Sequence, residues 1–203
     1  MTRYFSNLLS WVLHPLWMPF YLFVALALHA PGLIGDQIQL LTLSVMILML
    51  TGVLPAFNLM LFRIIGTIPD LRLSERKDRI IPFMFITLVY LGVTWLFYSE
   101  YPVPGAFKLL LLIAASAVAG TIITMFHKTS IHALSSSAVT TILIWTEGSA
   151  YGGSLTGIIL ISVLMSGAVM SARLLLGAHS LKEIATGTAT GSLIAGAGMT
   201  ILF

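Results

Sequence analysis

The segment RLLLGAHSLKE, residues 173–183, gathers ionisable side chains whose spacing suits chemistry on a phosphate group. His179 and Glu183 are four residues apart, so on a helix they share a face, and the carboxylate can hold and orient the imidazole. Arg173 lies six residues before His179, and Gly177 between them lets the chain turn back. A nucleophile, an orienting carboxylate and a planar cation are the groups that phosphoryl transfer requires.

The same segment also has a purely structural interpretation. Ser180 and Glu183 fit the Ser-x-x-Glu capping box that begins a helix, and Arg173 and Lys182 would then anchor the chain at a membrane interface. Ionisable groups at membrane depth are rare and usually have a function. Capping and anchoring alone are therefore less favoured than chemistry.

Two further loops hold most of the remaining ionisable groups. The segment RIIGTIPDLRLSERKDR, residues 63–79, is rich in arginine, and HKTSIH, residues 127–132, combines two histidines with a lysine and a serine. A cluster of cations at a membrane face supplies the positioning and charge neutralisation that phosphoryl transfer needs.

These loops lie between strongly apolar segments. The chain of 203 residues is 58% hydrophobic and only 8% charged, with a mean hydropathy of +1.02, far above the values of soluble domains. The apolar segments are continuous and do not alternate, so they predict membrane-spanning helices and not the strands of a barrel. Their seven ranges are 8–30, 38–62, 80–98, 106–126, 133–145, 153–172 and 184–203.

The order of these segments predicts where the loops lie. Two helices separate each ion-rich loop from the next, so all three should emerge on one face of the membrane. The other connections, such as PGLIGDQ and EGSAYGG, are turns rich in proline and glycine. We therefore expect an all-α fold, a polytopic transmembrane helix bundle of six to seven spans, in which residues 1–203 form one domain with a polar site at one membrane face. The absence of cysteine excludes disulfides and thiol chemistry.

Other conspicuous residues have structural explanations. His14 and His29 lie near the ends of the first predicted helix and are expected to cap it or to lie at the interface. Gly187 and Gly191 are expected to let two helices pack closely.

The segment around His179 resembles the third signature of the type 2 phosphatidic acid phosphatase superfamily of membrane enzymes, which is written SRxxxxxHxxxD. Arg173, His179 and Glu183 match its spacing, with Ala172 at the serine position and glutamate in place of aspartate. The extra methylene keeps the charge but moves it by about 1.5 Å, which alters the hydrogen bond to the imidazole.

Two upstream segments resemble the other signatures of that superfamily, in the same order. The sequence TSIH is similar to PSGH and retains Ser130 and His132. Arg72 and Arg79 have the spacing of the two cations in KxxxxxxRP, with arginine in place of lysine. The resemblance runs from about residue 72 to residue 187, and three motifs in order are more specific than any one of them.

The resemblance implies a metal-independent phosphatase without a cofactor, acting on a lipid phosphate or a polyprenyl diphosphate. His179 would attack phosphorus to form a phosphohistidine, Glu183 would fix its tautomer, and His132 would protonate the leaving oxygen and later activate water. An apolar groove between helices would accept the lipid tail, and no nucleic-acid partner is expected. The groups that would hold the phosphoryl oxygens are Arg72, Arg79, Ser130 and Arg173, with Lys77 and Lys128 further out.

Two other functions remain open. A metal site is one, since His and Glu four residues apart suit zinc, although the surrounding cations would repel a metal. Its ligands would be His127, His132, His179 and Glu183. The other is a non-catalytic lipid-phosphate binder or flippase, which would keep the phosphate cradle without the chemistry. The departures from the signatures that favour a binder are Thr129, Ile131 and Glu183.

The orientation in the membrane receives two conflicting indications. Of the ten lysine and arginine residues, only Lys108 lies on the side opposite the ion-rich loops, so the positive-inside rule places these loops in the cytoplasm. The resemblance instead implies a site on the outer face of a bacterial inner membrane. Because several of these cations would bind phosphate, we favour the outer face.

Overall fold

The computed structural model describes residues 2–34, 37–71, 73, 75–101, 103–149, 151 and 153–203, and this part of the chain contains helices and turns but no strand. Each of the seven predicted apolar segments contains helix. Five described stretches are long and apolar enough to cross a membrane, as expected for an integral membrane protein with an all-α fold. They are Arg3–His29, Thr42–Ile64, Arg76–Ser99, Pro104–Phe126 and Thr156–Leu175.

The first predicted segment is broken, so the expectation of one continuous helix over residues 8–30 is wrong. A short 3₁₀ turn, η1 (Pro15–Trp17), separates α1 (Arg3–Val12) from α2 (Met18–His29). Before this turn the backbone of His14 is extended, with φ −66° and ψ 140°. Pro15 explains the break, because a proline disfavours helical backbone at the residue before it.

A second irregularity lies in the next span. After the short helix α3 (Pro31–Ile34), this span is formed by α4 (Gln37–Ile47), the π-helical segment η2 (Leu48–Val53) and α5 (Leu54–Ile64). Pro55 has no N–H to donate to the carbonyl of Thr51, four residues earlier. The hydroxyl of Tyr90, on α6 (Arg76–Ser99), donates to this carbonyl at 3.0 Å and satisfies it inside the bundle.

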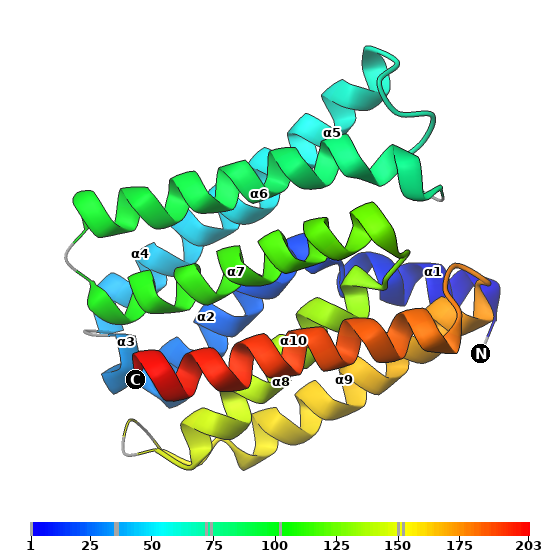
Figure 1. Ribbon diagram of the computed structural model, residues 1–203. Coiled ribbons are helices and arrows are strands. Elements are labelled where there is room, and N and C mark those ends of the chain that lie inside the picture. The colour runs from blue at the N-terminus through cyan, green and yellow to red at the C-terminus, as the bar shows by residue number, and fades with distance from the viewer. Residues whose placement is uncertain are drawn as a thin grey trace.

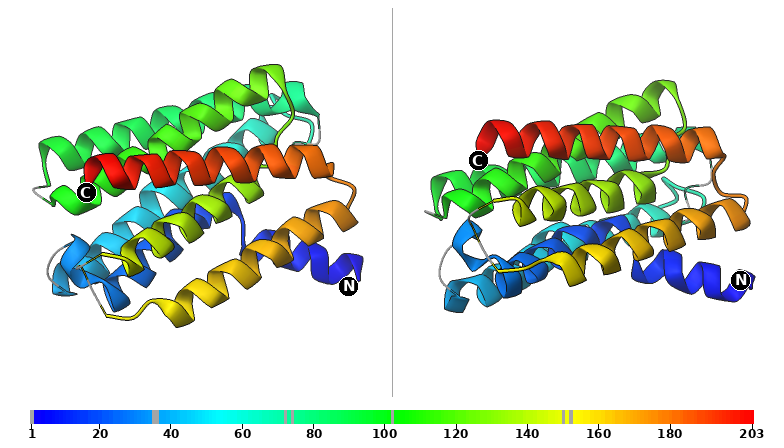
Figure 2. Two further views of the ribbon diagram at one scale, coloured as in Figure 1. Left: turned by 60° about the horizontal axis from the view of Figure 1, so that its bottom comes forward. Right: turned by 90° about the horizontal axis from the view of Figure 1, so that it is seen from below.

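The remaining helices form two closely packed pairs. α6 packs along α7 (Pro104–Phe126), and α8 (Ile131–Glu147) packs along α10 (Leu181–Leu202), while α9 (Thr156–Leu175) also contacts α8 (Figures 1 and 2). α8 and α10 both start at the same end of the bundle and run in the same direction (Figure 1). Their first turns are therefore neighbours.

Two glycines of α10 allow this close approach. A Cβ atom at Gly187 would lie 2.4 Å from the Ser130 carbonyl oxygen, and one at Gly191 would lie 2.1 Å from the Leu134 carbonyl oxygen. A larger residue fits at neither position unless a backbone moves, so the predicted packing role of both glycines is confirmed. The contact fixes the start of α8 against the start of α10.

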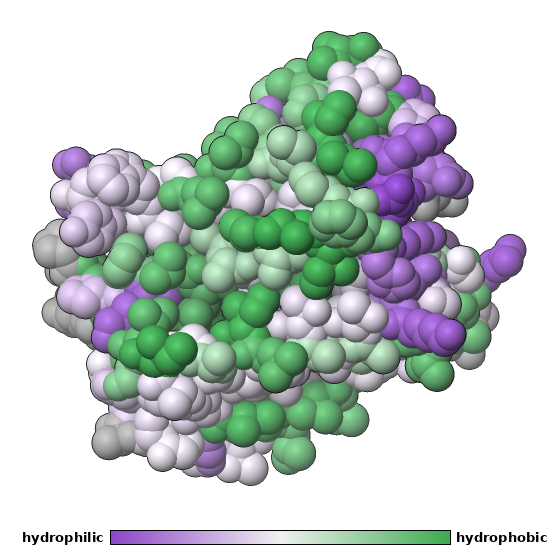
Figure 3. All heavy atoms as spheres, in the orientation of Figure 1, coloured by the Kyte–Doolittle hydropathy of each residue, from purple (hydrophilic) through white to green (hydrophobic). Residues whose placement is uncertain are grey.

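The three ion-rich loops lie at the same end of the bundle. In Figure 1 the connections α5–α6, α7–α8 and α9–α10 all lie towards the right, with the N-terminus, and the C-terminus lies at the opposite end. Hydrophilic side chains gather at this end in Figure 3, whereas much of the flank of the bundle is hydrophobic. The fold therefore brings together segments that are far apart in the sequence.

Candidate functional site

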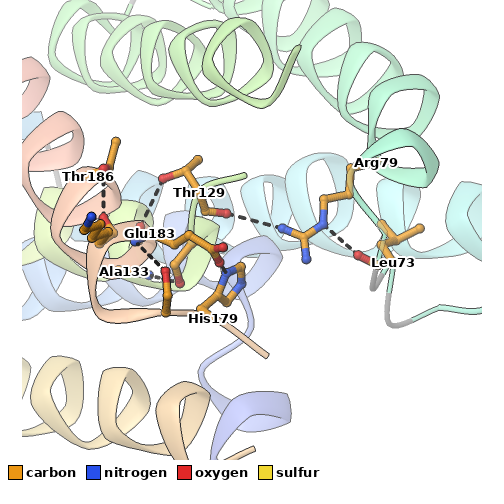
Figure 4. A network of polar contacts seen from close by, with 10 residues as sticks. Leu73, Arg79, Thr129, Ala133, His179, Glu183 and Thr186 are labelled. Atoms are coloured by element: carbon orange, nitrogen blue, oxygen red, sulfur yellow. Dashed lines mark hydrogen bonds and ion pairs between the residues drawn. The ribbon is translucent and has the colours of Figure 1, made fainter. Parts of the chain in front are cut away.

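His179 is held by the carboxylate of Glu183. Nδ1 of His179 lies 2.6 Å from Oε2 of Glu183, and no other basic side chain pairs with a carboxylate within the described residues (Figure 4). An ionised carboxylate can only accept, so Nδ1 carries the proton and donates it. Nε2 then has the free lone pair that a nucleophile requires.

The turn before His179 is built by the end of α9. Gly177 has a positive φ of 65°, and the N–H groups of Gly177 and Ala178 donate to the carbonyls of Leu174 (2.9 Å) and Arg173 (3.1 Å). This is the Schellman arrangement that ends many helices, and it favours glycine at the left-handed position. It reverses the chain so that Arg173 and His179 line the same cavity.

Ser180 caps α10 but does not complete the capping box. Its hydroxyl accepts a hydrogen bond from the Glu183 N–H at 3.3 Å. In a complete box the Glu183 carboxylate would return to the Ser180 N–H, whereas here it binds His179, which lies just before the cap. Capping therefore accounts for Ser180, and the carboxylate orients the imidazole.

Burial lowers the pKa of His179 from its ordinary value of 6.5 to about 4. The hydrogen bond to Glu183 opposes this shift, and the positive charges of Arg79 and Arg173 add to it. The side chain is only 2% exposed, so water does little to screen these charges. The imidazole is therefore neutral at neutral pH.

Arg79 bridges two of the ion-rich loops from the first turn of α6. Its Nε donates to the Leu73 carbonyl at 2.6 Å and its Nη1 to the Thr129 carbonyl at 3.3 Å (Figure 4). Leu73 adopts a left-handed backbone conformation with φ 50°, which is strained for a leucine. Both acceptors are neutral, and no carboxylate of the described residues forms an ion pair with this buried guanidinium.

Arg173 is the second cation beside His179, after Arg79. Its Nε is buried and has no hydrogen-bond partner within the described part of the chain. Arg173 is close enough to Arg79 for the two charges to repel each other, and it also lies near the imidazoles of His14, His132 and His179. Glu183 and Glu75 act on Arg79 only from beyond ion-pair distance, and two buried guanidinium groups without an ion-paired carboxylate are typical of a site that binds an anion.

The second loop contributes backbone groups and the start of α8. Thr129 and Ser130 are fully buried, and the Glu183 carbonyl accepts from the Ser130 N–H at 3.1 Å and from the Thr129 hydroxyl at 3.2 Å. The Ser130 hydroxyl caps α8 by accepting from the Ala133 N–H at 3.4 Å. This hydroxyl keeps its own proton for donation.

His132 contacts a segment near the start of the chain. Its Nε2 lies 3.0 Å from the Ser10 carbonyl oxygen, and its ring meets that of His14 nearly at a right angle, with 5.5 Å between centroids. His14 has the capping role expected of it, because its Nδ1 accepts from the Leu16 N–H at 3.3 Å. It also lines the cavity beside His179, which sequence reasoning missed. The sequence feature that could have pointed to His14 is its place directly before Pro15, inside a long apolar segment.

The structure gives less support for the other predicted phosphate-binding residues. Lys77 is exposed and Lys128 is half-buried, and neither makes a side-chain hydrogen bond within the described residues. Arg72 lies outside the described residues. Arg76, which the sequence did not single out, caps α7 by donating to the carbonyls of its last turn, including that of Met125.

A cavity of about 180 Å³ extends from these groups into the bundle. Its wall also includes apolar side chains from α2, α6, α7 and α8, such as Leu22, Ile86, Leu112 and Ile142. The combination suits a molecule with an anionic head and an apolar tail. The basic side chains that line the cavity are His14, Arg79, His132, Arg173 and His179.

The residues considered for a metal site are not grouped as ligands. Within the described chain, no three or more histidine, cysteine, aspartate or glutamate residues are arranged to hold a metal ion. His127 is exposed, and the facing atoms of His179 and Glu183 bind each other.

Function must be inferred from these residues and their geometry. Comparison with known proteins finds no match for this chain among family models, curated proteins or solved structures.

Proposed function

We propose that this chain is a membrane-embedded, metal-independent phosphatase that removes a phosphoryl group from a lipid phosphate or a polyprenyl diphosphate. One arrangement carries the proposal: His179, neutral and held through Nδ1 by Glu183, shares a cavity with Arg79 and Arg173. Phosphoryl transfer needs a positioned nucleophile and fixed positive charge around the transferred group, and these four residues supply both.

The reaction takes two steps. Nε2 of His179 attacks phosphorus, a P–N bond forms, and the P–O bond to the lipid breaks while His132 gives a proton to the leaving oxygen. His132 then takes a proton from water, whose oxygen attacks the phosphohistidine, so that the P–N bond breaks and inorganic phosphate is released. Glu183 stabilises the imidazolium that forms on His179 in the first step.

The phosphoryl oxygens are held by several donors. Arg79 and Arg173 line the cavity and neutralise their charge. The Ser130 hydroxyl has a proton to donate, but it is fully buried and does not line the cavity, so it needs a local movement to reach a phosphoryl oxygen. The backbone N–H groups of Ile131 and His132, at the start of α8, have no hydrogen-bond partner within the described residues, and a helix N-terminus favours an anion. The isoleucine side chain therefore does not remove the backbone donors. The outer cations that attract the substrate are Lys77 and Lys128. Arg72, which lies outside the described residues, keeps its predicted role as a further cation for the phosphoryl oxygens.

The apolar part of the cavity takes the lipid tail, so the chemistry occurs at one face of the bundle. We assign α8 and α10 as further membrane crossings, which with the five long apolar stretches makes seven. α8 is the shortest crossing, with 17 residues, and lies among other helices. The proposed location is a bacterial inner membrane with the site on its outer face.

A phosphate-release screen tests the activity. The purified full chain in detergent is offered undecaprenyl diphosphate, phosphatidylglycerol phosphate, phosphatidic acid and a lipid A phosphate, with and without a chelator. We expect release from at least one substrate, resistance to the chelator, and no release by His179→Ala. His127→Ala, which changes the exposed histidine at the start of the second loop, is the matched control and should retain activity.

A lipid-phosphate binder or flippase is the second candidate. It is favoured by the hydrogen bond between His132 Nε2 and the Ser10 carbonyl, because this bond ties up one nitrogen of the proposed acid and base. A wild-type protein that binds these lipids without releasing phosphate from any of them supports this alternative and rejects the enzyme.

The orientation is testable because the chain has no cysteine. A single cysteine introduced at the exposed Lys77 should react with a membrane-impermeant maleimide added outside intact cells. Labelling only after the cells are opened places the ion-rich loops in the cytoplasm instead.

A further inference from the structure

The end of α1 lies against the second imidazole of the cavity. The carbonyls of Leu9 and Trp11, in its last turn, accept hydrogen bonds from the chain that follows. The carbonyl between them, that of Ser10, accepts from Nε2 of His132 at 3.0 Å. Carbonyls at a helix end need such partners, so His132 completes the end of α1.

This contact fixes which ring nitrogen of His132 carries the proton. A backbone carbonyl has no hydrogen to donate, so Nε2 is the donor. In the neutral ring Nδ1 is then unprotonated, and it has no hydrogen-bond partner among the described residues. Nδ1 is therefore the nitrogen that remains for proton exchange with a substrate.

His14 holds the same ring from a second direction. Its own orientation is set by the extended backbone before Pro15 and by the bond that its Nδ1 accepts from the Leu16 N–H, at 3.3 Å. The rings of His14 and His132 meet at 81°, with 5.5 Å between their centroids, an edge-to-face arrangement that aromatic rings favour. Both rings line the cavity that also contains His179.

The geometry points to a positioning element, made of Ser10 and His14, that holds His132 in its Nε2–H form and presents Nδ1 to the leaving oxygen. This inference rests on the proposed phosphatase function and adds a segment that lies outside all three signature-like motifs. The contacts of Ser10 and His14 with His132 are a hydrogen bond and a ring contact, so in this inference they act by orienting the general acid and base.

The groups that face His132 come from three places in the fold. Arg173 belongs to α9, His179 to the α9–α10 turn and His14 to the junction between α1 and η1. Because Arg173 is a fixed positive charge, protonation of Nδ1 depends on whether an anion is bound beside it. A bound phosphate group offsets this charge and lets His132 hold the proton that it transfers.

The proton position can be measured without any activity assay. In the full chain labelled with ¹⁵N-histidine in detergent micelles, the His132 signals are those that disappear in His132→Gln. We expect a one-bond N–H coupling at Nε2 and none at Nδ1 at neutral pH. A proton on Nδ1, or an equal mixture of the two forms, overturns the inference.

Two substitutions separate the ring contact from the cap of η1. His14→Asn keeps a side-chain acceptor for the Leu16 N–H but removes the ring, and His14→Phe keeps a ring but removes the acceptor. Without the His14 ring, the His132 ring is free to turn away from the Ser10 carbonyl, so we expect His14→Asn to give mixed His132 tautomers and to lower kcat about tenfold with little change in KM. His14→Phe should retain a single tautomer and most of kcat. Equal effects of both variants, or no effect of either, contradict a role for the ring.

The control and the possible outcomes distinguish a failure of the phosphatase proposal from a failure of the positioning element. His29→Ala changes a histidine at the far end of α2 and should leave both the tautomer and kcat unchanged. A wild type that releases no phosphate from any substrate rejects the phosphatase, while the NMR measurement still decides the tautomer. Normal phosphate release with His132 protonated on Nδ1 rejects the positioning element alone.

Discussion

The two imidazoles of the cavity are held in different ways. His179 takes its partner Glu183 from four residues along the chain, after a turn made by a nearby glycine. His132 takes its partner Ser10 from 122 residues away and packs against His14 of the same distant segment. The first arrangement needs only one helix start, whereas the second needs α1, which packs on α9, to place its end beside α8. Mutations near His179 and mutations near His132 should therefore have different effects.

The largest effect should come from removing the imidazoles themselves. His179→Ala removes the proposed nucleophile, so phosphate release should fall by at least about a thousandfold. His132→Ala removes only the proposed acid and base, so the rate should fall about a hundredfold, with phosphohistidine detectable by ³¹P NMR of the denatured protein. Equal losses in the two variants, without a trapped intermediate, would erase the proposed difference between them.

The local partner comes next. Glu183→Gln keeps a hydrogen-bonding group but cannot stabilise an imidazolium, so kcat should fall by about a hundredfold with a smaller change in KM. The control is Glu100→Gln, which changes an exposed carboxylate at the C-terminal end of α6, away from the cavity. A Glu183→Gln protein with wild-type kcat would mean that the 2.6 Å contact has no role in catalysis.

The third test concerns the close contact between α8 and α10, which joins the regions of His132 and His179. In Gly187→Ala the new Cβ meets the Ser130 carbonyl at 2.4 Å, so α8 and α10 must separate at a cost of roughly 1–3 kcal/mol. Gly157→Ala, on α9, adds a Cβ to open space and should be neutral or slightly stabilising. Thermal unfolding in detergent measures both. Equal melting temperatures would contradict the close approach of the two helices.

The last test changes only the pH and leaves every residue in place. Because the pKa of His179 is lowered by burial, the unfolded chain binds more protons than the folded protein between pH about 4 and 6.5. The stability contribution of this residue is complete above that range and is lost as the pH falls through it, by at most about 1.4 kcal/mol per pH unit. Melting temperatures from pH 4 to 8 should show this slope, and His179→Gln should reduce it. The charged groups around the ring are Arg79, Arg173 and Glu183.

The sequence was informative where structure follows from local pattern. The apolar runs mark the helices because a membrane crossing needs a fixed length of apolar residues. The spacing of His179 and Glu183 brings the two side chains within reach because it spans about one helical turn. Pro15 was visible as well, but the long apolar run around it favoured one helix, and the break at His14 was missed.

The remaining features depend on contacts that no spacing predicts. The link from His132 to Ser10 exists only after α1 has docked. Arg76 and Arg79 belong to the same basic run, yet the first caps α7 and the second holds the Leu73 and Thr129 carbonyls. The role of each arginine depends on how α6 is rotated about its axis, because this rotation decides which side chain of the first turn faces α7. The packing of α6 against α7 sets this rotation.

Three hydroxyls in the cavity wall are already satisfied by the protein. Tyr90 donates to the Thr51 carbonyl, and the Thr87 and Thr121 hydroxyl oxygens lie 2.8 Å apart, each also within reach of a backbone carbonyl. Water is retained inside a protein only where it finds two to four polar partners, and these groups offer few. The part of the inner wall around Thr87, Tyr90 and Thr121 therefore behaves as hydrocarbon in spite of its hydroxyls. An alkyl chain can enter it without displacing a strongly held solvent molecule.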